Sequence, residues 1–523
     1  MDALCSFGIL KVLRKSTHQL LWFAAIFGAL LLSILSCERE DDAVDVEALI
    51  AIHCGSCHLV PDPGELTRDR WEEFVLPRMG YFLGIYESPE ERAELIEAST
   101  GGEIVEAAEV FPKKPLIDRE DWQHIVNYYL DLAPEKIEVA PKQIPATAPF
   151  AAEFPEMYLS PPSTTLTQFS NDGGIFLGDA HTGQIFDCDN RMEPLSNGKV
   201  GEGAVGIEAI GGQLLITVMG QFSPTDAALG YIVALPEDRV GSAEIIIDQL
   251  QRPVHTAYGD LHGEGRTDIV VCEFGKWTGG LTLFHAMEDG SYERHRLLNT
   301  PGATRAYIQD MNSDGRSDIV ALFAQGSEGI DIFYNKGNSE FSRVRVLRFP
   351  STYGSSYFDL FDFNDDGNLD IIYTAGDNAD FKPLMKPYHG VYVYLNDGDN
   401  RFEQAFFQHI NGAYKAIPAD FDSDGDIDIA TISFFPDWEL SPDEGFVYLE
   451  NTGEGDFDFN LSTFKGVGQG RWITMDAADI DLDGDHDLVL GSLAFETTPD
   501  LGHVEKWSRN GIPFVVLRNL VEQ

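Results

Sequence analysis

The sequence predicts two domains of different class, a small all-α domain followed by a much larger all-β domain. Between residues 44 and 134 the apolar residues recur at helical spacing, whereas residues 151–523 consist of short strand-like runs. Residues 135–150 are rich in proline and predict a semi-stiff linker between the two. Two features contain the candidate functional residues. They are a compact cysteine–histidine motif in the first domain and an acidic loop that recurs through the second.

Residues 1–36 predict an export signal. Basic residues at 11, 14 and 15 precede an apolar run from Leu20 to Leu35, which is shorter than the about 20 residues that a membrane span needs. The end of this run resembles the lipobox of bacterial lipoproteins, and the resemblance implies that Cys37 is acylated. An uncleaved N-terminal anchor is the alternative. Under either interpretation the rest of the chain lies outside the cytoplasm.

Residues 37–43 form an acidic tract that resembles the surface-export tethers of Bacteroidetes-type lipoproteins. The resemblance implies an outer-membrane or cell-surface lipoprotein of a Gram-negative bacterium, held at the membrane through its lipid anchor.

Residues 53–58 read HCGSCH and pose a choice between a disulfide, a zinc site, a thiol switch and a haem anchor. Zinc would need a second ligand pair, and a redox thiol pair would lie in a βαβ unit, which this region does not resemble. In an exported chain, CxxCH is the attachment signature of haem c. Cys54 and Cys57 would bind the haem vinyl groups, and His58 would be the proximal iron ligand. The remaining Cys188 and Cys272 are predicted to be buried free thiols, with a disulfide bridge between them as the alternative.

The region 44–134 as a whole resembles a small class I cytochrome c. Met79, two residues after Pro77, resembles the Pro-x-Met ligand loop of that family, and the resemblance implies that it is the sixth iron ligand. His53 and His124 compete for this role, and Met79 could instead fill a gap in the core. Two helices are predicted around these residues, one opening at the capping box of Ser88 and one covering 118–132.

An acidic loop recurs in the second domain, starting at residues 260, 310, 362, 420 and 479, and each copy is followed by a strand-like run. It carries oxygen-bearing side chains at its first, third and fifth positions, glycine at the sixth and a carboxylate at the ninth. In the weaker first copy His262 and Glu264 replace two of these acidic or amide residues. The candidate ligands are Asp260, Glu264, Asp268, Asp310, Asn312, Asp314, Asp318, Asp362, Asn364, Asp366, Asp370, Asp420, Asp422, Asp424, Asp428, Asp479, Asp481, Asp483 and Asp487.

This pattern is typical of calcium loops, because calcium prefers a cage of oxygen ligands and the glycine permits the sharp turn. An EF-hand is excluded, since the twelfth position is never Glu and lies inside the following strand. The loops therefore resemble the strand-flanked FG-GAP or VCBS-type repeats of integrin-like propellers. Seven blades of about 53 residues fill residues 151–523, and the ring can close between the chain end and a strand near its start. Acidic turns without metal are the alternative.

The net charge of −50, from 36 basic and 86 acidic residues, excludes binding to nucleic acid or anionic lipid by charge. The chain contains no motif of a hydrolase, metalloprotease or nucleotide-binding enzyme. His255 could point into the central funnel of a propeller, or it could be a satisfied histidine at a strand end.

Together these features resemble a family of exported FG-GAP/VCBS-repeat lipoproteins with an N-terminal cytochrome c-like domain. The resemblance implies a cell-envelope electron-transfer protein with one haem c, four to five calcium ions and a propeller that binds a redox partner or substrate. Two alternatives are an adhesion or assembly propeller with an auxiliary haem, and an oxidoreductase with its active site in the propeller funnel.

Overall fold

The computed structural model describes residues 44–238, 242–379, 383–453, 457–497 and 499–521. The expected signal segment, Cys37 and the acidic tether lie outside these residues. Among the described helices, none is long and apolar enough to cross a membrane.

The described residues before 133 form a series of helices. They are α2 (Val46–His53), η1 (Pro63–Glu65), α3 (Arg68–Arg70), η2 (Trp71–Val75), α4 (Leu76–Phe82), α5 (Pro89–Glu94), α6 (Thr100–Ala107) and α7 (Arg119–Leu132). The predicted capping box is present, since the Ser88 hydroxyl accepts a hydrogen bond from the Glu91 N–H at 3.3 Å. This helix ends at Glu94.

Helix α7 contributes Trp122, Ile125 and Tyr129 to the helical core, because these residues share one face at helical spacing. The ring of Tyr129 packs on that of Trp71 with centroids 4.5 Å apart. Gly80 of α4 lies so close to Trp122 that a Cβ there would be 3.3 Å from the indole ring. Small and large residues therefore interlock where α4 and α7 cross.

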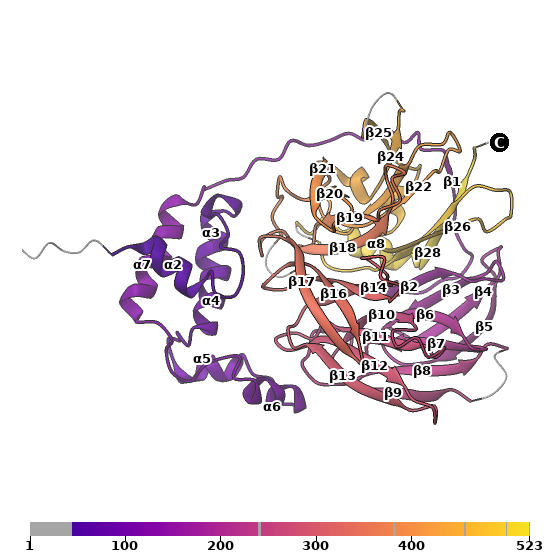
Figure 1. The fold of residues 1–523 in the computed structure, drawn as a ribbon. Coiled ribbons are helices and arrows are strands. Elements are labelled where there is room, and N and C mark those ends of the chain that lie inside the picture. Colours follow the sequence, from indigo (N-terminus) through magenta and orange to yellow (C-terminus); the bar gives the residue numbers. More distant parts are fainter. Residues whose placement is uncertain (1–43, 239–241, 380–382, 454–456, 498, 522–523) are drawn as a thin grey trace, which may run out of the picture. The chain divides into compact units, whose positions relative to one another are not determined.

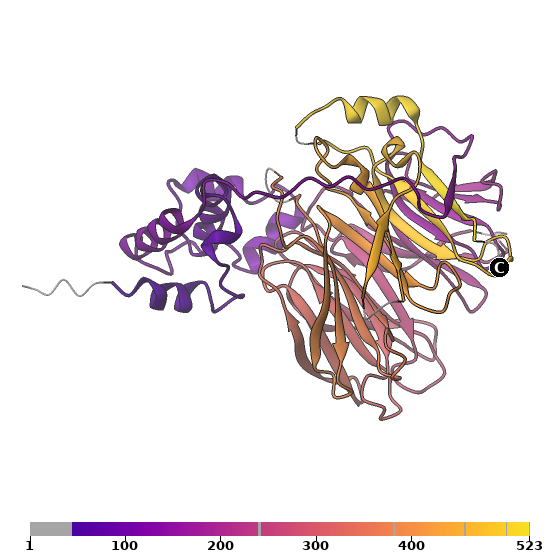
Figure 2. The ribbon, with the colours of Figure 1, turned by 90° about the horizontal axis from the view of Figure 1, so that it is seen from above.

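The described residues from Phe150 onward form 28 strands arranged in seven four-stranded antiparallel sheets. Figure 1 shows these sheets arranged around a common axis as the blades of a propeller, and Figure 2 shows them from above. The predicted seven-bladed β-propeller is confirmed. The two blades that lack an acidic loop precede the five that carry one, as the length of the chain predicted.

Blade 1 contains β2 (Thr164–Phe169), β3 (Ile175–Asp179), β4 (Gln184–Cys188) and β5 (Pro194–Lys199). Blade 2 contains β6 (Ala204–Ile210), β7 (Gln213–Val218), β8 (Gly230–Pro236) and β9 (Glu244–Leu250). Blade 3 contains β10 (Pro253–Gly259), β11 (Asp268–Glu273), β12 (Gly280–Ala286) and β13 (Tyr292–Leu298).

Blade 4 contains β14 (Ala303–Gln309), β15 (Asp318–Phe323), β16 (Gly329–Gly337) and β17 (Glu340–Arg348). Blade 5 contains β18 (Ser355–Phe361), β19 (Asp370–Ala375), β20 (Gly390–Asn396) and β21 (Phe402–His409). Blade 6 contains β22 (Ala413–Ala419), β23 (Asp428–Ser433), β24 (Phe446–Asn451) and β25 (Phe459–Ser462). The last blade contains β26 (Trp472–Ala478), β27 (Asp487–Ser492) and β28 (Phe514–Asn519), with helix α8 (His503–Asn510) before β28.

The ring closes through strand β1 (Phe150–Glu153), which pairs antiparallel with β28 and becomes the outermost strand of blade 7. Phe150 lies opposite Asn519 in this register. Closure leaves each sheet flanked by two neighbours, and a cluster of buried apolar residues fills each of the seven junctions between blades. Cys188 and Cys272 are buried free thiols inside these clusters, as predicted.

Candidate haem and metal sites

The CxxCH motif occupies a turn that continues directly from α2. The N–H groups of Cys54 and Gly55 both donate to the Ile50 carbonyl, at 2.8 and 3.0 Å, and the Cys57 N–H donates to the Cys54 carbonyl at 3.3 Å. Both cysteines are free thiols, with Cys57 exposed and Cys54 half-buried. Burial and then the neighbouring Cys57 raise the pKa of Cys54 to about 11, which keeps this thiol protonated at neutral pH.

His58 is oriented so that one ring nitrogen is available to a ligand. Its Nδ1 lies 2.6 Å from the carbonyl oxygen of Leu59, an acceptor, so Nδ1 carries the proton and Nε2 keeps its lone pair. A histidine that ligates a metal commonly donates its other N–H to a carbonyl or carboxylate, which fixes the tautomer. The residues of the motif therefore fit covalent haem c with His58 Nε2 as the iron ligand.

Met79 lies in helix α4, and the expectation that it lies in a loop is wrong. Pro77 lacks an N–H group and would break an ordinary helix, but here a π-helical turn, η2, precedes α4 and widens the helix. The competing ligands are also helical, with His53 ending α2 and His124 inside α7. Among the three candidates, the identity of the sixth ligand stays a prediction.

The acidic loops share one backbone conformation. In blade 4, Asp310 at the first position accepts hydrogen bonds from the N–H groups of Asp314 and Gly315, at 3.2 and 2.8 Å. The fourth position, Ser313, has φ of 56° and Gly315 has φ of 83°. This left-handed backbone explains the glycine at the sixth position. In blades 3, 5, 6 and 7, the first-position aspartate likewise accepts a hydrogen bond from the N–H of the sixth-position glycine in its own loop.

The ninth-position aspartate also anchors its loop to the blade. In blade 4, buried Asp318 accepts from the N–H groups of Met311 in its own loop and Asn335 at the end of β16, at 3.1 and 2.8 Å. The equivalents Asp268, Asp370 and Asp428 make the same pair of bonds. Asp487 accepts from the Asn519 N–H and from Arg518. These carboxylates tie the loop to the third strand of its own blade.

The loops of blades 6 and 7 contain buried carboxylate oxygens that lack any partner among the described residues. They are Oδ1 of Asp420, Asp426 and Asp485. Burial and then neighbouring carboxylates raise the pKa of Asp426 to about 6 and that of Asp485 to about 6. Such crowding is unfavourable unless a cation is bound, so the donor set fits calcium. Within these loops, Asp420, Asp422 and Asp428 form one cluster, and Asp479, Asp481 and Asp483 form another.

Asp426 and Asp485 occupy the seventh position, which the repeat pattern did not mark as a ligand. In blades 3 and 4 this position holds arginine, and Arg316 pairs with Asp314 at 2.5 Å while Arg266 pairs with Glu264. The arginines partly neutralise their loops. The crowding of unneutralised carboxylates is therefore graded around the ring, and is greatest in blades 6 and 7.

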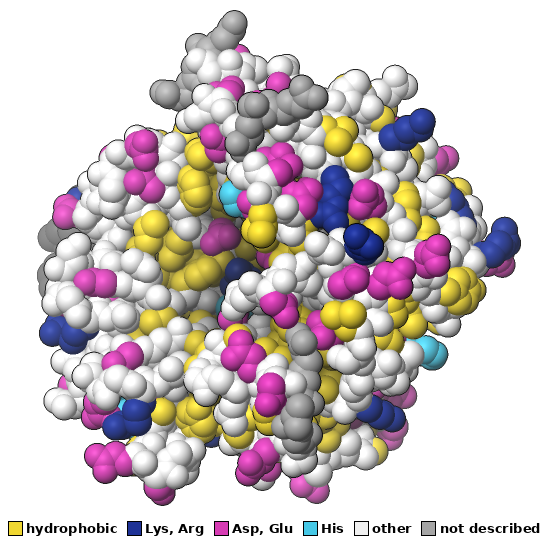
Figure 3. Space-filling view, turned by 90° about the vertical axis from the view of Figure 1, so that its right-hand side faces the viewer, with side chains coloured by type: hydrophobic (Ala, Val, Ile, Leu, Met, Phe, Trp, Pro, Cys, Tyr) yellow, Lys and Arg dark blue, Asp and Glu magenta, His cyan; other side chains and the backbone are white. Residues whose placement is uncertain are grey.

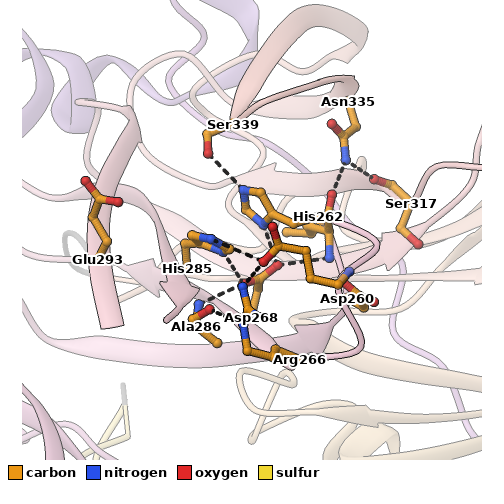
Figure 4. A network of polar contacts seen from close by, with 12 residues as sticks. Asp260, His262, Arg266, Asp268, His285, Ala286, Glu293, Ser317, Asn335 and Ser339 are labelled. Carbon is orange, nitrogen blue, oxygen red and sulfur yellow. Dashed lines mark hydrogen bonds and ion pairs between the residues drawn. The ribbon is translucent and has the colours of Figure 1, made fainter. Parts of the chain in front are cut away.

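The loop of blade 3 departs from the others, as Figure 4 shows. Asp268 is bracketed by two histidines, with Nδ1 of His262 2.7 Å from one carboxylate oxygen and Nδ1 of His285 2.8 Å from the other. Burial alone would raise the pKa of Asp268, but hydrogen bonds from His262, the Ala286 N–H and His285 lower it. Asp268 thus clusters with two histidines and not with Asp260 and Glu264. No repeat signal marks His285, because it lies on β12, beyond the loop.

The model of the FG-GAP-like repeat family matches residues 310–373. These residues carry the acidic loops of blades 4 and 5. No curated protein matches the chain.

Several solved structures are similar to the chain at low identity. Virginiamycin B lyase from Staphylococcus aureus is 10% identical with a TM-score of 0.43, covering 70% of this chain and 98% of that one. The N-terminal domain of Nup159 is 10% identical with a TM-score of 0.40, covering 73% and 97%. Sqt1 from Saccharomyces cerevisiae is 11% identical with a TM-score of 0.40, covering 68% and 84%.

Proposed function

We propose that this protein is a cell-envelope c-type cytochrome whose β-propeller binds a partner or substrate and is stabilised by calcium. The observation that carries the electron-transfer function is the CxxCH turn, with two unpaired thiols and a histidine whose Nε2 is free to ligate. A haem bound there would supply one-electron transfer. In this role Cys54 and Cys57 fix the haem covalently and His58 sets one axial position.

The calcium part of the proposal rests on the partnerless buried oxygens in the loops of blades 6 and 7. A cation that binds only the folded ring adds RT ln(1 + [L]/Kd) to its stability, about 2.7 kcal/mol at a hundredfold excess over Kd. The side chains that would hold it are those at the first, third, fifth and seventh positions, joined in blade 6 by the ninth-position Asp428, which clusters with Asp420 and Asp422. The backbone hydrogen bonds of the ninth-position aspartates hold the loops in place.

The proposed location rests on the sequence alone. The N-terminal run resembles a lipoprotein signal, so acylated Cys37 would tether the folded chain to the outer membrane or the cell surface. Adhesion through the propeller remains the second candidate function, because the FG-GAP-like repeat supports a binding propeller without requiring redox chemistry.

A redox titration of the purified mature protein tests the electron-transfer function. We expect one reversible, single-electron change in the visible haem bands per chain. The paired variants His58→Ala and His181→Ala separate the motif histidine from an exposed histidine of the propeller. If His58→Ala leaves the titration unchanged, the assigned iron site is wrong.

A further inference from the structure

The innermost strands of the seven blades line a central channel. Each of these strands has a register shift next to its second residue, which places a bulge at the same level of every blade. Figure 3 shows a hollow in the middle of one propeller face, with apolar walls and a basic side chain in its depth. The residues that follow the bulges are candidates to contact anything that enters.

The third residues of four successive inner strands are His255, Arg305, Tyr357 and Lys415. They interact across the junctions between blades, so they face one another around the axis. His255 Nδ1 lies 3.3 Å from the N–H of Ala306 in the next blade. The guanidinium carbon of Arg305 lies 4.5 Å and the Lys415 Nζ 5.0 Å from the Tyr357 ring centroid. Two cations from different blades therefore flank one aromatic ring.

Neither cation has a carboxylate within ion-pair distance among the described residues. Arg305 donates its Nε to the Tyr307 hydroxyl at 2.6 Å, and Lys415 donates to the Met475 carbonyl at 2.7 Å. These bonds orient the two side chains but use only one donor of each. Other buried arginines of the propeller satisfy their donors with carboxylates, as Arg345 does with Asp331 at 2.7 Å, or with several backbone carbonyls, as Arg471 does. The remaining donors of Arg305 and Lys415 are available to an anion.

The carboxylates of the channel lie two residues further along the inner strands. Asp476 accepts from the Phe169 N–H of blade 1 at 2.8 Å, and Asp359 accepts from the Tyr357 hydroxyl at 3.1 Å. The channel therefore presents cationic donors at one level, acceptors at the next and tyrosine rings between them. This order matches a small molecule with a carboxylate at one end, hydroxyl groups at the other and a face that packs on an aromatic ring.

We infer that the channel binds a hydroxylated organic carboxylate, such as a uronic acid, with its carboxylate held between Arg305 and Lys415. This inference rests on the proposed binding function of the propeller and names the class of its ligand. It requires neither haem nor lipid.

Calorimetric titration of the calcium-replete mature protein with D-galacturonate, D-gluconate and D-galactose tests the inference. Either acid should bind at least about tenfold more tightly than neutral D-galactose, because only the acids carry a carboxylate that can pair with Arg305 and Lys415. Arg305→Gln and Lys415→Met should each weaken binding of the acid at least about tenfold. Arg401→Gln makes the same chemical change at a highly exposed site and should leave binding unchanged.

Circular dichroism and thermal melting establish that each variant is folded. If Arg305→Gln does not fold, Arg305→Lys keeps the charge but removes the planar fork and should still weaken binding. The inference is wrong if neither acid binds at millimolar concentration, or if both channel variants bind it as the wild type does. If the protein binds haem and has a higher melting temperature with calcium but binds neither acid, only this inference is contradicted.

Discussion

Asn519 joins two blades of the propeller at the point where the chain ends. Its side-chain Nδ2 donates to the Phe421 carbonyl in the acidic loop of blade 6 at 2.7 Å, while its backbone N–H donates to Asp487 in blade 7 at 2.8 Å. Asn335 repeats this arrangement between blades 4 and 3, with Leu261 as the acceptor at 2.7 Å. The asparagine that ends these third strands therefore couples neighbouring blades through their loops.

Removing this link should destabilise the ring. Asn519→Ala leaves the buried Phe421 carbonyl without its side-chain donor, and we expect a loss of about 1–3 kcal/mol in the free energy of unfolding. Asn335→Ala should cost a similar amount at a junction far from the closure. Asn197→Ala, at an exposed position of β5, is the control. Urea denaturation measures all three, and equal stability of Asn519→Ala and wild type would contradict the coupling.

Calcium dependence should be graded around the ring. Asp424→Ala and Asp483→Ala remove fifth-position oxygens from the loops with partnerless carboxylates, so each should lower the calcium-dependent rise in melting temperature. Asp314→Ala, in a loop that Arg316 partly neutralises, should have a smaller effect. Asp289→Ala, in an exposed turn outside the repeats, should have none.

Calorimetry with and without chelator measures these differences. The form without calcium should weaken further at low ionic strength, where repulsion between the aspartates is poorly screened. If chelator does not change the melting temperature of the propeller at low salt, the loops are acidic turns without metal.

The Met79 prediction is independent of the propeller. If Met79 is the sixth ligand, Met79→Ala should abolish the weak near-infrared thioether band of the oxidised protein and lower its reduction potential. His124→Ala and His53→Ala should preserve both signals. A band that survives in Met79→Ala assigns the sixth position to another residue.

Binding of an acid in the channel should depend on pH through Lys415. Burial and then Arg305 lower the pKa of Lys415 to about 8, although Asp476 and Asp359 oppose this shift. The ammonium form holds the anion, so affinity should be nearly full at pH 7, about half at pH 8 and about tenfold weaker at pH 9. Tyr357 also faces Lys415, and its pKa lies well above 10, so it stays neutral over this range.

His255 stays neutral as well, because burial, Arg305 and Lys415 all lower its pKa. Lys415→Arg keeps its charge at pH 9 and should remove most of the pH dependence. An identical pH profile in the wild type and in Lys415→Arg would show that another group controls binding.

The proposed lipid anchor at Cys37 can be tested independently of the structure. Cys37→Ala should release the protein from the membrane fraction, because the acylated cysteine is its proposed anchor. Metabolic labelling with a fatty acid should mark the wild type and not the variant. Absence of label on the wild type would make the lipoprotein interpretation wrong.

The sequence predicted the features that depend on local spacing. The repeat of Asp310 and its equivalents set the number of blades, and the capping box of Ser88 marked the start of a helix. It missed features that only tertiary contacts create. Met79 lies in a helix because a π-helical turn accommodates Pro77. His285 reaches Asp268 from a neighbouring strand, and Asp318 is engaged by backbone N–H groups from two segments.

Most of the channel residues could not be predicted from a sequence pattern. Arg305, Tyr357 and Lys415 lie on the inner strands of three successive blades, and only the packing of these blades brings both cations to the Tyr357 ring. His255 was the one channel residue that the sequence singled out, and it does reach the inner strand of the next blade. Its neighbours carry no motif.

Acid–acetone extraction tests the central claim most directly, since only covalently attached haem stays with the polypeptide. Protein made together with cytochrome maturation factors should keep one haem per chain after extraction. Cys54→Ala combined with Cys57→Ala should lose it, whereas Cys188→Ala, which removes a buried thiol far from the motif in sequence, should retain it. A wild-type protein that is colourless, or that loses its haem on extraction, would contradict the account.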